Sequence, residues 1–208
     1  MSKLRKLNTG RRKFIQDSAA LGGAAALAGW VPSMALAQGT GKIKVGLMLP
    51  YTGTYGQIGL VITNAFKLAI EENGGKLGGR DIEYATVDDE SDPAKGADNA
   101  NRLVNRDKVD VLVGTVHSGV QMGIQKIARE SGVLTIIPNA GVAAATTELC
   151  APNIFRTSFA NGQTTYPMGQ VMAKKGHKNV VTLSWRYAAG EEMIESQRSL
   201  GNRRRRAT

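Results

Sequence analysis

Cysteine and histidine are scarce in this sequence: Cys150 stands alone, and the 208 residues include only two histidines. A single cysteine excludes an intrachain disulfide. No G-x-S-x-G stretch marks a nucleophilic serine, and the acidic run DDESDP (88–93) lacks the glycine and the spaced terminal carboxylate of a calcium loop. We therefore predict no catalytic residue, no metal site and no cofactor. An exported enzyme that uses Cys150 or His117 is the alternative from another class of function.

Acidic residues are scarce at both ends of the chain, which carries a formal net charge of +10. Residues 1–37 hold six basic side chains and one acidic one, and residues 197–208 hold five arginines and no acid. Of the 27 basic and 17 acidic residues, 16 of each therefore lie between 38 and 196, where they cancel. A neutral middle argues against a nucleic-acid partner, despite the arginine-rich end.

Long hydrophobic runs are missing as well. The apolar stretch at 18–31 is about 14 residues long, short of the ~20 that a membrane-spanning helix needs. It follows the paired Arg11–Arg12 and precedes an A-x-A site formed by Ala35 and Ala37. This order predicts a signal peptide of the twin-arginine (Tat) type over residues 1–37, cleaved after Ala37, and a periplasmic protein.

From Lys42 onward, short apolar runs alternate with amphipathic segments. The expected strands are 42–50, 81–89, 109–115, 133–138, 154–158 and 179–185, and the expected helices are 60–73, 91–107, 118–132, 163–175 and one that starts near 189. Ser91 or Asp92 is the expected N-cap of the second helix, with Pro93 at its first position. Strands that alternate with helices of this length predict an α/β fold with a doubly wound parallel sheet.

Ligands of such sheets bind where the parallel strands end, so the loops that leave the strands carry the candidate site. The loop after the first strand contributes Ile58, and the loop after the third contributes His117 and Ser118. Ser118 is the expected N-cap of its helix, where its hydroxyl and the free backbone N–H groups could hold a carboxylate. Asn139 and Gly141 follow the fourth strand and could receive hydrogen-bond donors, or could form an ordinary tight turn.

Taken together and in this order, several stretches resemble the periplasmic substrate-binding proteins of ABC importers, in the branched-chain amino-acid (leucine-binding) family. The matching stretches are IKVGLMLPYTGTYG, AFKLAIEENGGKLGGRDIEYATVDDESDPAKGADNANRLV, VDVLVGTVHSG, GVLTIIPNAG and PNIFRTSFANGQ. The resemblance implies a type I binding fold with two α/β lobes joined by a hinge. It places lobe one at 38–160 and the beginning of lobe two at 161–196.

The resemblance also implies a non-enzymatic, monomeric protein that delivers a small ligand to a membrane permease. Ser118 matches the family's serine for the ligand carboxylate, while Asn139 and Gly141 match the positions that receive an amino group. Gly141 replaces a threonine that is frequent in the family. Branched-chain amino acids are the default ligand class, and aromatic or other organic acids are the close second, with Tyr187 or Trp185 as an aromatic wall.

The stretch QRSLGNRRRRAT (197–208) departs from the family pattern. It has no apolar periodicity and no strand after it, whereas family members continue through the rest of lobe two. We therefore expect the helix that starts near 189 to break at Gln197, the tail to be disordered and the chain to be a truncated product.

Overall fold

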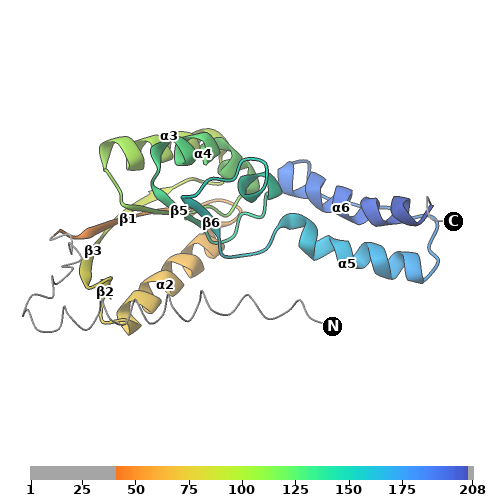
Figure 1. The fold of residues 1–208 in the computed structure, drawn as a ribbon, viewed down its shortest axis with the longest axis horizontal. Helices are drawn as coiled ribbons and strands as arrows, with labels where there is room; N and C mark the ends of the chain where they lie inside the picture. The colour runs from red at the N-terminus through yellow and green to blue at the C-terminus, as the bar shows by residue number, and fades with distance from the viewer. Residues whose placement is uncertain (1–40, 206–208) are drawn as a thin grey trace, which may run out of the picture. The chain divides into compact units, whose positions relative to one another are not determined.

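Strands and helices alternate through residues 41–205, the part of the chain that the computed structural model describes (Figure 1). The predicted signal peptide at 1–37 lies outside these residues. The strands are β1 (Ile43–Leu49), β2 (Lys76–Leu77), β3 (Arg80–Asp88), β4 (Val111–Val113), β5 (Leu134–Ile137) and β6 (Ile154–Arg156). The helices are α2 (Gly56–Glu72), α3 (Pro93–Asn101), a π-helical turn (Arg102–Arg106), α4 (Ser118–Ser131), a 3-10 turn (Ala143–Thr146), α5 (Asn161–Lys174) and α6 (Ala188–Arg205).

The six strands form one sheet in the order β2-β3-β1-β4-β5-β6. All neighbours are parallel except β2, a short edge strand that pairs antiparallel with β3 and was not expected from the sequence. The register at the centre places Val45 of β1 between Tyr84 of β3 and Val111 of β4. Because the chain winds outward from β1 in both directions, the predicted doubly wound parallel sheet is confirmed.

Helices cover both faces of the sheet, with α2 on one side and α3 and α4 on the other (Figure 1). Under α3 and α4, Met48, Leu103, Leu112 and Ile124 are fully buried in one apolar cluster. On the opposite face, the apolar side chains of β1 and β4 pack with Phe66 of α2. This two-sided burial explains why the central strands read as continuous apolar runs rather than as an alternating pattern.

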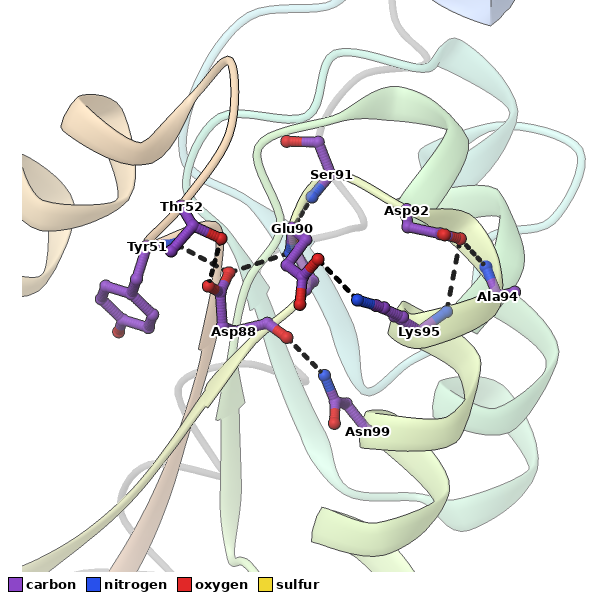
Figure 2. A network of polar contacts seen from close by, with 10 residues as sticks. Tyr51, Thr52, Asp88, Glu90, Ser91, Asp92, Ala94, Lys95 and Asn99 are labelled. Atoms are coloured by element: carbon purple, nitrogen blue, oxygen red, sulfur yellow. Dashed lines mark hydrogen bonds and ion pairs between the residues drawn. The ribbon is translucent and has the colours of Figure 1, made fainter.

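The acidic turn between β3 and α3 is a structural connector (Figure 2). Asp88 accepts hydrogen bonds from the backbone N–H of Tyr51 at 2.8 Å and from the Thr52 hydroxyl at 2.7 Å, which ties the loop after β1 to the end of β3. Asp92 caps α3 by accepting from the N–H of Ala94 at 2.8 Å. Asp92 is thus the cap, and Pro93 opens the helix as expected.

α5 and α6 lie side by side, but the segment that joins them is not a strand. The sequence predicted a strand at 179–185, whose apolar composition suits a sheet. Instead, Val181 is 97% exposed and Leu183 is 96% exposed. No other strand of the described residues lies beside this segment to complete a hydrogen-bonded ladder, so the expectation of a strand there is wrong.

The end of the described chain also differs from its expectation. α6 does not break at Gln197 but continues to Arg205. Arginine and leucine have high helix propensity, and positive charge near a helix C-terminus interacts favourably with the helix dipole. The hydrogen bond between the Ser196 hydroxyl and the Gly162 carbonyl, 2.8 Å long, holds this helix against α5.

Candidate ligand-binding site

The candidate site lies at the carboxyl ends of β1, β4 and β5. β1 and β4 are neighbours, yet the helices that follow them cover opposite faces of the sheet, so their outgoing loops part at this edge. Such a point leaves a crevice in doubly wound sheets. Gly59 fixes one side of it, since a Cβ there would collide with the Pro50 carbonyl oxygen. α2 can therefore lie directly against the end of β1.

A cavity of about 110 Å³ occupies this crevice. It is lined by Tyr55, Ile58, Val116, His117, Ser118, Asn139, Gly141, Phe159, Asn161, Tyr187, Ala189 and Met193. Six of the residues that the sequence singled out as ligand-binding candidates belong to this lining: Ile58, His117, Ser118, Asn139, Gly141 and Tyr187. The remaining six were not predicted, because several come from the start of α5 and α6, whose positions depend on tertiary packing.

Ser118 is buried and forms the first residue of α4. Its hydroxyl oxygen accepts a hydrogen bond from the Asn161 side-chain nitrogen at 3.2 Å. Ser118 is not the N-cap that the sequence suggested. That role belongs to His117, whose Nδ1 accepts from the N–H groups of Gly119 at 3.1 Å and Val120 at 3.4 Å.

This capping role fixes the chemistry of the His117 ring. A nitrogen that accepts hydrogen bonds from N–H groups carries no proton, so the neutral ring keeps its proton on Nε2. Burial lowers the pKa of His117, which also favours the neutral form. His117 therefore offers the site one N–H donor and an aromatic face, with its other nitrogen already engaged.

Aromatic rings form one wall of the cavity. The rings of His117 and Tyr187 are stacked, with centroids 4.8 Å apart and an interplanar angle of 21°. Tyr55 lies 6.0 Å from the His117 ring. Burial, together with a hydrogen bond to Tyr55, raises the pKa of Tyr187 to about 12. Of the two aromatic residues that the sequence left open, Tyr187 lines this cavity and Trp185 does not.

A second, wider cavity of about 400 Å³ is lined by the same three rings. Trp185, Arg186, Thr54, Glu90 and Ser91 complete its lining. Trp185 is 69% exposed, so this space is an open mouth rather than an enclosed pocket. The three rings thus line both the inner cavity and this mouth.

Gly141 leaves room for a residue that the sequence did not point out. A Cβ at Gly141 would collide with the amide oxygen of Asn161, whose backbone N–H also donates to the Gly141 carbonyl at 2.8 Å. The Asn161 side chain therefore occupies the space that a threonine at position 141 would need. Its stretch, SFANGQ, belongs to the family resemblance, but the sequence did not single out Asn161 as a site residue.

Of the two residues that the enzymatic alternative would use, His117 lines the inner cavity and Cys150 does not. Cys150 is exposed and lines neither cavity. Within residues 41–205, no group of three or more histidine, cysteine, aspartate or glutamate side chains could hold a metal ion. Among the helices that the structure describes, none combines the length and apolarity needed to cross a membrane.

The profile of a known family, described as periplasmic binding protein, matches residues 42–200. The chain belongs to this family. A solved solute-binding protein of an ABC transporter from R. palustris, in complex with benzoate, is 52% identical with a TM-score of 0.74, over 78% of this chain and 45% of that one. A second, from Rhodopseudomonas palustris BisB5 in complex with 3,4-dihydroxybenzoic acid, is 33% identical with a TM-score of 0.71, over 78% and 44%.

Other members of the family are named for a different class of ligand. A Leu/Ile/Val-binding protein homolog from Brucella abortus is 28% identical over 149 residues, which is 71% of this chain and 38% of that protein. The chain thus spans less than half the length of these relatives. The relatives are solute-binding proteins rather than enzymes, so the prediction of a non-enzymatic family member is confirmed.

Proposed function

We propose that this chain carries the ligand-binding lobe of a periplasmic solute-binding protein that supplies an ABC importer, and that its ligand is a small aromatic carboxylate. The observation that carries the proposal is the composition of the inner cavity. A serine hydroxyl at a helix N-terminus faces the same space as the stacked rings of His117 and Tyr187. A carboxylate suits the first and a flat ring suits the second.

The cavity offers little to an ammonium group. Within the described part of the chain, no aspartate or glutamate lines it. The nearby Glu192 is engaged, because its carboxylate accepts from the Ala143 N–H at 3.0 Å and from the Asn161 side chain at 2.8 Å. The ammonium group of an α-amino acid would therefore lose its hydration in the cavity without gaining a carboxylate partner. This favours the acids that carry a carboxylate alone, as does the 52% identity to the benzoate-bound protein.

Branched-chain amino acids are the second candidate ligands. The curated Leu/Ile/Val-binding relatives favour them. Ile58 and Met193 give the cavity apolar surface on which an aliphatic side chain could also rest. In either case, a membrane permease is the expected recipient of the ligand.

Titration calorimetry with benzoate and with leucine separates the two candidates, and benzoate is expected to bind at least tenfold more tightly. Ser118→Ala removes a charge-assisted hydrogen bond and should weaken benzoate binding by about 1.5–3 kcal/mol. Ser131→Ala, at the opposite end of α4 and outside the cavity, is the matched control and should leave the affinity unchanged. Tighter leucine binding, or equal affinity of Ser118→Ala and the unaltered chain, would contradict the proposal.

A further inference from the structure

A continuous chain of hydrogen bonds runs from the backbone after β5 to the hydroxyl of Ser118. The Ala143 N–H, at the start of the 3-10 turn, donates to the Glu192 carboxylate at 3.0 Å. The Asn161 side-chain nitrogen donates to the same carboxylate at 2.8 Å and to the Ser118 oxygen at 3.2 Å. Asn161 and Ser118 are each only 3% exposed, so water does not compete with these bonds.

The direction of each bond in this chain is determined. A carboxylate only accepts hydrogen bonds, so Asn161 must turn its nitrogen, and not its oxygen, toward Glu192. The same nitrogen then faces Ser118, whose oxygen acts as an acceptor. A hydroxyl that accepts on one side keeps its own hydrogen for a partner on another side. No residue of the described chain takes that hydrogen, so it is available to the cavity.

Glu192 is itself held in place. Burial lowers the pKa of the Arg156 guanidinium, and the nearby negative charge of Glu192 opposes this effect. Arg156 in turn donates to the Val142 carbonyl at 2.8 Å and to the Thr146 hydroxyl at 2.6 Å. These contacts fix the loop after β5 on both sides of Ala143. The carboxylate that orients Asn161 therefore has a defined position, although it is provided by α6.

We propose that Asn161 is a positioning residue that makes the Ser118 hydroxyl a hydrogen-bond donor toward the ligand. Glu192 in turn determines that Asn161 presents its amide nitrogen, and not its amide oxygen, to Ser118. This inference rests on the proposed function, because it assumes that Ser118 meets a carboxylate. It also explains why position 141 is a glycine, since only glycine there leaves room for the Asn161 amide. Because Glu192 comes from α6 and Ser118 from α4, carboxylate binding is coupled to the contact between these two helices.

Asn161→Asp tests the polarity directly, because it replaces the amide by a carboxyl group of nearly the same shape. The new group shares one proton with the adjacent Glu192 carboxylate and therefore offers Ser118 only an acceptor. The Ser118 hydroxyl would then donate to the new carboxylate and turn away from the ligand. Calorimetry should show a loss of benzoate affinity at least tenfold larger than the loss for benzamide, which carries no negative charge. Asn161→Leu should weaken benzoate binding by about tenfold, the scale of one buried hydrogen bond.

A double-mutant cycle that combines Asn161→Leu with Ser118→Ala separates a positioning role of Asn161 from a general structural role. If Asn161 acts through Ser118, Asn161→Leu should have no further effect on benzoate binding in the Ser118→Ala background. Equal losses in both backgrounds, or equal losses for benzoate and benzamide in Asn161→Asp, would overturn the positioning role while leaving the proposed function intact. Failure of the unaltered chain to bind benzoate would instead refute the proposed function.

If the unaltered chain does not bind benzoate, a measurement on the ligand-free protein still tests the positioning role of Asn161. The side-chain amide protons of Asn161 should appear in the nuclear magnetic resonance spectrum as hydrogen-bonded signals that exchange slowly with water. Glu192→Ala should shift both signals and accelerate their exchange, and Ser118→Ala should shift one of them. Signals that resemble a solvated asparagine amide, unchanged by either substitution, would overturn the proposed polarity.

Discussion

Similar apolar runs adopt different structures in two regions of the molecule, the sheet region (residues 43–156) and the helix pair α5 and α6. In the sheet region, apolar runs such as VDVLVGT become strands buried by helices on both faces. In the second region, the equally apolar run at 179–185 stays irregular, with Val181 and Leu183 exposed. The difference lies in the neighbours: β4 lies between β1 and β5, whereas 179–185 has no strand of the described chain beside it.

This contrast shows that an apolar run specifies a strand only where a partner completes its hydrogen bonds and a helix covers it. Isolated strands gain too little buried surface to offset the conformational entropy that they lose. The α5–α6 pair instead holds together through polar contacts, such as the bond from the Thr165 hydroxyl to the Met193 carbonyl at 2.9 Å. The following predictions probe this contrast, beginning with the largest expected effect.

Leu112→Ala should produce the largest loss of stability. Leu112 is fully buried at the centre of the sheet, and its truncation removes apolar contacts and leaves a cavity. Substitutions of this kind lower the free energy of unfolding by about 2–5 kcal/mol. Urea unfolding followed by circular dichroism provides the measurement. A loss below about 1 kcal/mol would mean that the sheet region is no better packed than the helix pair.

Asp89→Asn should change how stability depends on pH. Asp89 is fully buried, its second carboxylate oxygen has no hydrogen-bond partner, and burial raises its pKa from 3.8 to about 6. The unfolded chain therefore ionises first as pH rises, so wild-type stability falls between pH 3.8 and about 6. This ionisation costs up to about 3 kcal/mol above pH 6.

Asparagine does not ionise, so the fall in stability attributable to position 89 should disappear in the variant. Thermal or urea unfolding at pH 4, 5, 6 and 7 measures it as a stability difference that moves in favour of Asp89→Asn as pH increases. Asp88→Asn offers a contrast of opposite sign. Burial opposes ionisation of Asp88, but hydrogen bonds from Tyr51, Thr52 and Glu90 outweigh it and lower its pKa. Parallel profiles for wild type and Asp89→Asn would contradict the prediction.

Val181→Ser should have the smallest effect. The side chain is almost wholly exposed and makes no contact with the apolar clusters of the sheet region. Surface substitutions of this type stay within about 0.5 kcal/mol of wild-type stability. The same urea titration as for Leu112→Ala gives the comparison. A loss above 1 kcal/mol would show that the segment at 179–185 is buried in solution.

Much of the sheet region could be predicted from the sequence, because its signals are local. Pro93 and the capping side chain of Asp92 mark the start of α3, and Gly132, in a left-handed conformation with φ of 70°, ends α4. The candidate site was partly predictable for a related reason. In a parallel sheet all outgoing loops meet at one edge, so Ser118, Asn139 and Gly141 were expected to converge before any distance was known.

Other features depended on the conformations and packing of individual side chains. The sequence could not assign the N-cap of α4 to His117 rather than Ser118, because both side chains can accept hydrogen bonds from a helix terminus. Nor could it reveal Asn161, which reaches the site only because α5 begins beside Gly141. It also could not choose between Tyr187 and Trp185 as the aromatic wall, a choice that the stacking of Tyr187 on His117 decides.

The sequence by itself determined the alternation of strands and helices, the doubly wound order of the sheet and the edge at which a ligand would bind. These properties follow from apolar periodicity, helix signals and the handedness of crossover connections, all of which act over short stretches of chain. Only the tertiary structure decided that 179–185 has no strand partner, that His117 caps α4 and that Glu192 and Asn161 orient Ser118. The hydrogen bonds of Asn161 to Glu192 and to Ser118 join residues 31 and 43 positions apart along the chain, and no local pattern fixes the distance between such groups.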